Sequence, residues 1–169
     1  MQTQYSRYIW NKINSLKKPL ILVCNDDGIT APGILNLIES VKDLARLVVV
    51  APNSPQSGMG HAITIDSTLE VNKVKLDSSL ADIPAYSTSG TPADCVKLAL
   101  HEILDVKPDL CISGINHGAN SSINVIYSGT MSAAIEAGVE GIPAIGFSLL
   151  DFSWGANFSA CRSVVRTLV

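Results

Sequence analysis

Two adjacent carboxylates, Asp26 and Asp27, stand directly after the apolar segment 19–24 and just before Gly28. An apolar run of this length that ends in polar residues and glycine is typical of a buried parallel strand leading into a loop. Neighbouring acids repel one another, so a buried strand end that carries both usually offers them a cation. The pattern therefore favours a hard-metal site. The alternative is that both acids cap the helix that begins near Ala31 and contact no metal.

Two further oxygen-bearing side chains follow later strands of the predicted sheet. Ser57 lies in the loop 52–61, and Asn116 lies in the loop 114–120. Because the carboxyl ends of parallel strands share one edge of a sheet, these side chains can converge on the two acids. Carboxylate, hydroxyl and amide oxygens are ligands that Mg²⁺ and Mn²⁺ prefer. Each of the two is an ordinary loop residue when taken alone, so the metal hypothesis depends on their joint placement.

The segment 128–130, Ser-Gly-Thr, stands at the start of a predicted helix. Free backbone N–H groups and hydroxyls at a helix start form a suitable cradle for phosphate. A simple N-cap at Ser128 explains the same residues without a ligand. The segment 89–91 repeats the pattern at another helix, where Thr91 followed by Pro92 favours capping more strongly.

Two histidines flank the predicted site, His61 and His117. Neutral imidazole titrates near physiological pH, so either residue could act as a general acid or contact substrate. A local hydrogen-bonding role is the alternative for each. His101 lies inside a predicted helix and is expected to be a surface or packing residue.

The elements that must position these residues alternate along the chain. Apolar runs predict strands at 20–24, 47–51, 109–113 and 143–149. Apolar periodicity with helix-start signals predicts helices at 32–44, 91–104 and 157–168, and one that begins at 128 and ends at 138 or 141. A hairpin or sheet edge is expected at 62–74. This alternation with short connections predicts a parallel sheet covered by helices on both faces.

Composition bounds the class of protein. The chain has 169 residues, of which 47% are hydrophobic and 16% charged, with a net charge of −3. This length predicts one domain, at 19–169, preceded by an N-terminal extension at 1–18 without a catalytic role. A targeting or partner-docking helix is the alternative for that basic, partly apolar extension. The acidic body argues against binding nucleic-acid polymers, and no apolar stretch reaches the length of a membrane span.

The cysteines indicate a reducing compartment. Cys24, Cys95, Cys111 and Cys161 are far apart, without a CxxC pair or a Cys/His cluster. They are expected to be reduced core thiols. Since the N-terminus also lacks the pattern of a signal peptide, a cytoplasmic location is expected.

Five short motifs of this sequence occur in an order that is known from a protein family. They read VCNDDG at 23–28, APNSPQSGMGHAIT at 51–64, SGTPADCV at 89–96, SGINHGAN at 113–120 and YSGT at 127–130. With these motifs the chain resembles the SurE survival-protein nucleotidases, and several long motifs are far more specific than a lone glycine pattern. The resemblance implies a Rossmann-like, three-layer αβα fold with a mostly parallel sheet. It also implies metal-dependent hydrolysis of nucleoside monophosphates by a 5'-nucleotidase, with 3'-nucleotidase and exopolyphosphatase activities as further expectations.

The same resemblance implies a set of site residues. One divalent ion per subunit, Mg²⁺ or Mn²⁺, would be held by Asp26, Asp27, Ser57 and Asn116, and either acid could also serve as base or nucleophile. Near the phosphate it suggests Asn25, Gly60, Ser128, Gly129 and Thr130, with His61 as a further substrate contact. Family members assemble as homodimers or homotetramers through a hairpin and C-terminal elements. They continue well beyond the position of Val169, so those elements are expected to be lacking here.

Two rival functions remain open. Phosphatases of the haloacid dehalogenase type also use acids after their first strand, but they need a second Asp two residues on, whereas Asp26 and Asp27 are adjacent. The other rival is a module that binds nucleotide without turnover, because the family's C-terminal elements are absent from this sequence.

Overall fold

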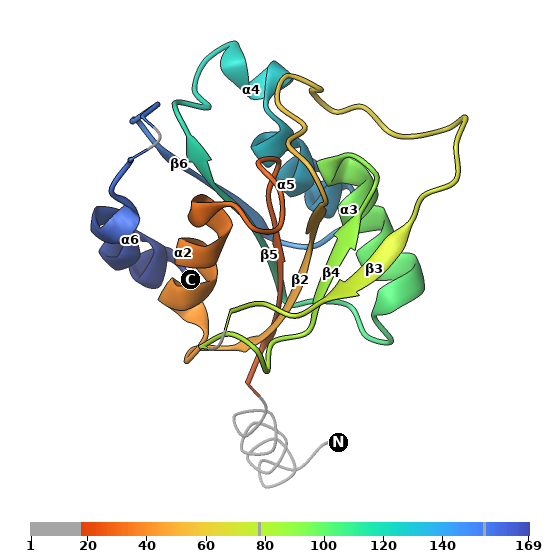
Figure 1. The fold of residues 1–169 in the computed structure, drawn as a ribbon, viewed down its shortest axis with the longest axis horizontal. Coiled ribbons are helices and arrows are strands. Elements are labelled where there is room, and N and C mark those ends of the chain that lie inside the picture. Colours follow the sequence, from red (N-terminus) through yellow and green to blue (C-terminus); the bar gives the residue numbers. More distant parts are fainter. Residues whose placement is uncertain (1–17, 78, 154) are drawn as a thin grey trace, which may run out of the picture.

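The computed structural model describes residues 18–77, 79–153 and 155–169. The predicted N-terminal extension therefore lies almost wholly outside the described residues. Six strands form one sheet in the order β3-β4-β2-β1-β5-β6 (Figure 1). Their bounds are β1 Leu20–Cys24, β2 Arg46–Pro52, β3 Val71–Val74, β4 Ala85–Thr88, β5 Leu110–His117 and β6 Ala144–Leu149. All neighbours pair in parallel except β3, which is antiparallel to β4, so the mostly parallel sheet is confirmed.

Helices cover both faces of this sheet. Their bounds are α2 Pro32–Val41, α3 Pro92–Leu98, the π-helix η1 Ala99–Ile103, α4 Asn124–Tyr127, α5 Gly129–Val139, the 3₁₀ helix η2 Phe158–Ala160 and α6 Cys161–Leu168. Helix α2 packs against α6 on one face, and α3 packs against α5 on the other (Figure 1). The structure thus confirms the three-layer αβα prediction.

Strand β1 divides the core in two because its side chains alternate between the faces. Ile21 and Val23 pack with α2, whereas Leu22 and Cys24 pack with α3 and α5. All five residues of β1 are buried, which is the burial expected of a central strand in a parallel sheet. Three of the four cysteines are fully buried thiols, as expected, and the fourth, Cys161, is half-buried.

Several predicted boundaries were wrong. Helix α2 ends at Val41 and not at residue 44, and the predicted helix 91–104 is α3 followed by a π-helix. A hairpin or sheet edge was expected at 62–74, and the sheet edge is confirmed, because β3 at 71–74 is the edge strand of the sheet. Strand β4 and helix α4 were not predicted, and β5 continues through His117 into the segment expected to be a loop.

No helix in the described part of the chain is long and apolar enough to span a membrane.

The contact between α2 and β5 depends on Gly33, the second residue of the helix. A Cβ at Gly33 would collide with the backbone carbonyl oxygen of Ile115. We expect Gly33→Ala to lower the free energy of unfolding by about 1–3 kcal/mol, because backbone atoms cannot yield to the methyl group. Urea denaturation measures the change.

The matched control is Gly138→Ala in α5, where an added Cβ meets no atom within 4 Å. Alanine has the higher helix propensity, so this variant should be more stable than the wild type by roughly 0.5–1 kcal/mol. Equal stability of Gly33→Ala and the wild type would contradict the proposed close packing.

Candidate metal and phosphate site

A cavity of about 370 Å³ opens at the carboxyl edge of the sheet, and its wall contains all four predicted metal ligands. Asp26 and Asp27 follow β1, Ser57 follows β2, and Asn116 lies near the end of β5. Side chains up to 90 residues apart in sequence therefore meet at one place because the parallel strands end together.

Asp26 is held against the start of α5. Its side chain is buried, and one carboxylate oxygen accepts a 2.5 Å hydrogen bond from the Thr130 hydroxyl. Burial raises the pKa of Asp26, and repulsion from Asp27 raises it further, although the Thr130 hydroxyl and N–H groups act in the opposite direction. The net shift is upward, so the folded protein disfavours the carboxylate form that metal binding requires.

Asp27 is less enclosed than its neighbour. Burial raises its pKa, while the charge and the backbone N–H of His117 lower it, and the net shift is again upward. Two adjacent acids with raised pKa values form a site whose charge needs a partner.

The amide of Asn116 is held at the cavity wall by its nitrogen. Its nitrogen donates to the carbonyl oxygens of His117 and Gly118, at 3.0 and 2.9 Å. The amide oxygen lies 3.4 Å from the hydroxyl of Thr130, the same hydroxyl that binds Asp26. The fixed nitrogen therefore turns the oxygen toward the cavity, as metal ligation needs.

Ser57 lies on an exposed loop that is attached on both sides. The backbone N–H of Gln56 donates to the carbonyl oxygen of Asp26 at 2.8 Å, and that of Gly60 donates to the carbonyl oxygen of Tyr127 at 3.3 Å. These bonds bring the hydroxyl of Ser57 to the cavity wall.

The donor set fits a hard divalent cation. It offers two carboxylates, a hydroxyl and an amide oxygen. Among the described residues, neither Lys nor Arg lines the cavity, and no three His, Cys, Asp or Glu side chains are grouped as a metal site. An anionic phosphate could therefore enter only if a cation offset the two acids.

The capping alternative for the acid pair was wrong. Helix α2 has Ala31 as its N-cap, and no side chain caps it. At α5 both interpretations of the segment 128–130 apply, because the Ser128 hydroxyl accepts from the N–H of Met131 at 3.0 Å and Ser128 also lines the cavity. Capping by Thr91 is confirmed, since it forms a reciprocal capping box with Asp94.

Other predicted phosphate contacts lie around the cavity rather than on its described wall. Asn25 is buried and donates to the carbonyl oxygen of Gly28 at 2.9 Å. Gly60 packs beside the backbone of α4, and Gly129 packs directly against the side chain of Asp26. His61 contacts Glu136 of α5 at 2.7 Å. Their roles at a phosphate stay predictions.

His117 and His101 differ in their surroundings. His117 lines the cavity, and its ring meets that of Phe158 edge to face, with centroids 4.9 Å apart. His101 is exposed, as expected of a surface residue, and its ring nitrogen lies 3.6 Å from a carboxylate oxygen of Glu140.

Sequence reasoning missed part of the cavity wall. Asn120, Asn124, Tyr127 and Phe152 also line it. Tyr127 and Asn120 fall within the motifs quoted above and could have been proposed from them, whereas no local pattern marks Phe152.

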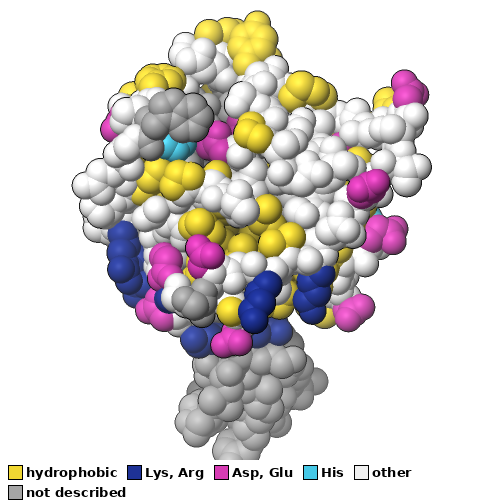
Figure 2. Space-filling model, viewed as in Figure 1, with side chains coloured by type: hydrophobic (Ala, Val, Ile, Leu, Met, Phe, Trp, Pro, Cys, Tyr) yellow, Lys and Arg dark blue, Asp and Glu magenta, His cyan; other side chains and the backbone are white. Residues whose placement is uncertain are grey.

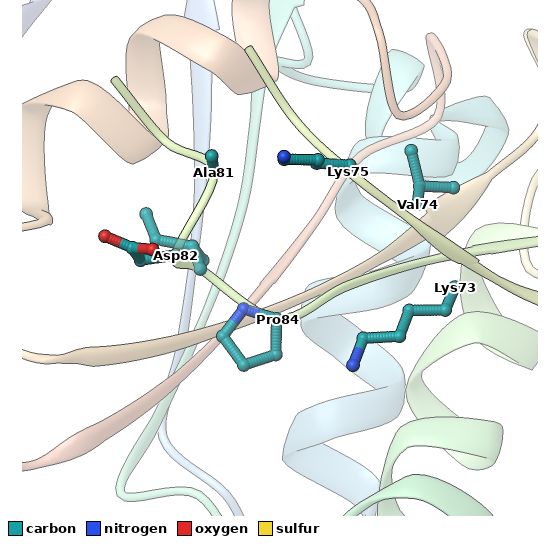
Figure 3. A pocket seen from close by; sticks show the side chains of 7 residues that line it. Lys73, Val74, Lys75, Ala81, Asp82 and Pro84 are labelled. Atoms are coloured by element: carbon teal, nitrogen blue, oxygen red, sulfur yellow. The ribbon is translucent and has the colours of Figure 1, made fainter. Parts of the chain in front are cut away.

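A second hollow, of about 390 Å³, lies at the opposite edge of the sheet (Figure 3). It is formed by the end of β3, which carries Lys73, and by the segment 81–84 that precedes β4. None of the predicted site residues lines it. The four predicted metal ligands line the cavity at the carboxyl edge instead.

Comparison with known proteins gives a consistent result. The family model described as survival protein SurE matches residues 21–169. The 5'-nucleotidase SurE of Flavobacterium psychrophilum is 63% identical over 153 residues, which are 90% of this chain and 59% of that protein. The 5'-nucleotidase SurE of Christiangramia forsetii is 67% identical over 152 residues, which are 90% of this chain and 58% of that protein.

A solved structure agrees with both. The SurE protein from Aquifex aeolicus superposes with a TM-score of 0.77 at 42% identity, covering 89% of this chain and 58% of that one. The chain thus spans a little under three fifths of the length of the relatives that it matches.

The raised pKa of Asp26 predicts a pH dependence of stability in the metal-free protein. The folded state holds this proton more tightly than the unfolded chain, whose Asp titrates near 3.8. The resulting stabilisation is complete below that pH and is lost as the pH rises through the raised pKa. In chelator, Asp26→Asn should therefore gain stability relative to the wild type as the pH rises above 3.8.

Urea denaturation at several pH values measures this difference. Adding Mn²⁺ at pH 7 should stabilise the wild type more than Asp26→Asn, because only the wild type retains all four predicted ligands. A difference that does not change with pH would contradict the raised pKa.

Proposed function

The chain belongs to the SurE family, and from that premise we propose that it hydrolyses the terminal phosphate of nucleoside monophosphates with a divalent metal ion. The curated relatives are named 5'-nucleotidases, and 5'-phosphate is the position that we propose first. Cleavage of 3'-monophosphates and of polyphosphate is proposed as a further activity of the same site.

One observation carries this proposal: oxygen ligands from separate parts of the chain line one cavity that contains no described Lys or Arg. Figure 2 supports the same view, because the basic side chains on that face gather away from α4, toward the other end of the molecule. A phosphate substrate would be repelled by two bare carboxylates. The site thus suits a phosphate ester only as a complex with a cation.

Asp26, Asp27, Ser57 and Asn116 would hold the ion. When bound, a divalent ion polarises a phosphoryl oxygen and lowers the pKa of a coordinated water. The protein's own contribution is to fix these oxygens before the substrate arrives. Thr130 keeps Asp26 in place, and the carbonyl oxygens beside Asn116 hold its amide.

The start of α5 supports the phosphate in a second way. Ser128 lines the cavity and caps this 11-residue helix, so the positive end of the helix dipole faces the site. This end favours negative charge that develops on the phosphoryl group. We propose that one of Asp26 and Asp27 also accepts a proton from the attacking water.

Two exposed aromatic rings support a nucleoside as the rest of the substrate. Tyr127 and Phe152 line the same cavity as the acids and are 60% and 79% exposed. Exposed rings beside a polar cavity offer surfaces on which a nucleobase can stack. We propose that they bind the base while the acids and the metal bind the phosphate.

The remaining partners are proposals from the family. Mg²⁺ or Mn²⁺ is the proposed ion, one per subunit, and a homodimer or homotetramer is the proposed assembly. We also propose a cytoplasmic location, in agreement with the four free cysteines. Binding of nucleotide without turnover is the alternative that the experiments below distinguish.

Removing either acid should remove activity. We expect Asp26→Asn and Asp27→Asn each to lower kcat/KM for AMP at least about 100-fold, because metal ligation contributes several kcal/mol to the transition state. Excess chelator should have the same effect on the wild type, and Mn²⁺ should restore it. Phosphate release measures the rate.

Asp43→Asn is the matched control, because Asp43 follows the C-terminal end of α2 and does not line the cavity. It pairs with Arg166 of α6 at 2.7 Å. It should keep full activity. Full activity of both acid variants in chelator would refute the metal mechanism, whereas tight AMP binding without turnover by the wild type would favour the binding module.

The aromatic rings should affect only substrates that carry a base. We expect Phe152→Leu and Tyr127→Leu each to raise KM for AMP about tenfold, since stacking on one ring contributes roughly 1–3 kcal/mol. KM for ribose 5-phosphate should not change. Leu150→Ala is the control, because Leu150 is exposed nearby but does not line the cavity. Equal effects on both substrates would contradict a base-binding role.

A further inference from the structure

His61 forms a side-chain hydrogen bond that the proposed chemistry does not use. Its Nε2 lies 2.7 Å from Oε2 of Glu136, a residue of α5 whose side chain is only 6% exposed. His61 directly follows the loop segment 53–60, which carries Ser57. The contact therefore joins the end of this loop to the helix whose first turn holds Asp26.

Glu136 is fixed from a second direction. Nζ of Lys97 in α3 lies 2.7 Å from Oε1 of Glu136, so each carboxylate oxygen has a cationic or imidazole partner. Burial raises the pKa of Glu136, but the contacts with Lys97 and His61 together outweigh burial, and the net shift is downward. A charged, nearly buried carboxylate with two partners is a rigid point of attachment for a loop.

The loop has few other attachments near Ser57. Residues 53–60 carry no charged side chain. Backbone N–H groups hold it at Asn53, Gln56 and Gly60, at 2.7, 2.8 and 3.3 Å from their acceptors. Between the last two, Gly58 has a φ of +74° and open space around it. The position of Ser57 thus depends on the contacts on either side of it. On the C-terminal side these are Gly60 and His61, followed by the carbonyl oxygen of Ala62, which accepts from the Thr91 hydroxyl at 2.7 Å.

Helix α5 contacts both Asp26 and the end of the loop that carries Ser57. Thr130 in its first turn binds Asp26, and Glu136 further along the same helix binds His61. We propose that Glu136 and His61 are positioning residues, which set the hydroxyl of Ser57 at the correct place relative to Asp26. This inference rests on the proposed function, because it assigns the pair to the affinity of the proposed metal site.

The experiment compares two histidines, one facing an acid of α5 and the other facing the acid that directly follows α5. His61 contacts Glu136, whereas His101 lies 3.6 Å from Glu140, beyond the C-terminal end of α5 and away from the loop. His61→Ala should weaken Mn²⁺ binding about tenfold, as loss of a residue that orients a metal ligand typically does. His101→Ala should bind Mn²⁺ as the wild type does. Titration of the free Mn²⁺ signal by electron paramagnetic resonance gives the affinities.

A conservative variant separates positioning from general stability. The side-chain amide of His61→Gln can still donate to Glu136, so this variant should recover most of the Mn²⁺ affinity lost in His61→Ala. Backbone hydrogen exchange at residues 57–60, measured without metal, should accelerate in His61→Ala alone. The free energy of unfolding of each variant shows whether a change in affinity follows a change in overall stability.

The outcomes are distinct. Unchanged hydrogen exchange in His61→Ala would overturn the anchor, and faster exchange with unchanged Mn²⁺ affinity would overturn its role at the metal. If the wild type bound no Mn²⁺, the proposed function would fail, and with it the pair's role in metal affinity. The hydrogen exchange would still show whether the pair anchors the loop.

Discussion

The contact between Asp26 and the first turn of α5 is the constraint on which the rest of the site depends. A side chain at position 129 would collide with the side chain of Asp26, so glycine is needed there. The hydroxyl of the next residue, Thr130, donates a hydrogen bond to the Asp26 carboxylate. The carbonyl oxygen of Asp26 then holds the Ser57 loop through Gln56. The end of β1, helix α5 and the Ser57 loop are therefore fixed relative to one another. A displacement of any of them would change the distances between the proposed ligands.

Electrostatics explains why such a site is costly without a cation. Burial raises the pKa values of both acids, repulsion from Asp27 raises that of Asp26 further, and no described Lys or Arg side chain lines the cavity to offset them. Burial of β1 and of the two apolar layers beside it stabilises the fold and offsets this cost. Glu136 shows the contrasting case, because an acid of similar burial is paired with Lys97 and His61 and has a lowered pKa. Helix α5 thus carries Glu136, whose charge is offset within the protein, and contacts Asp26, whose charge is not.

The fold was largely predictable because its signals are local. The apolar run of β1, the proline at the start of α2 and the capping box at Thr91 each depend on a few neighbouring residues. The errors arose where distant pairing decides the structure. Strand β4 is four residues long, and it pairs with β2 and β3. Strand β5 continues past Gly114 because a bulge lets Asn116 pair with Ser148 of β6, although the sequence there is rich in turn-forming residues.

The sequence by itself determined the identity of the chemical groups: the acid pair after the first strand, the motifs that carry Ser57 and Asn116, and the family to which they belong. These follow from residue types in short, ordered stretches. Only the tertiary structure decided what each group contacts. It placed the amide oxygen of Asn116 beside the Thr130 hydroxyl that binds Asp26, joined His61 to Glu136, and brought Phe152 to the cavity wall. Such contacts join residues remote in sequence, and their partners are chosen by the packing of α5 and the strand ends, which no local pattern records.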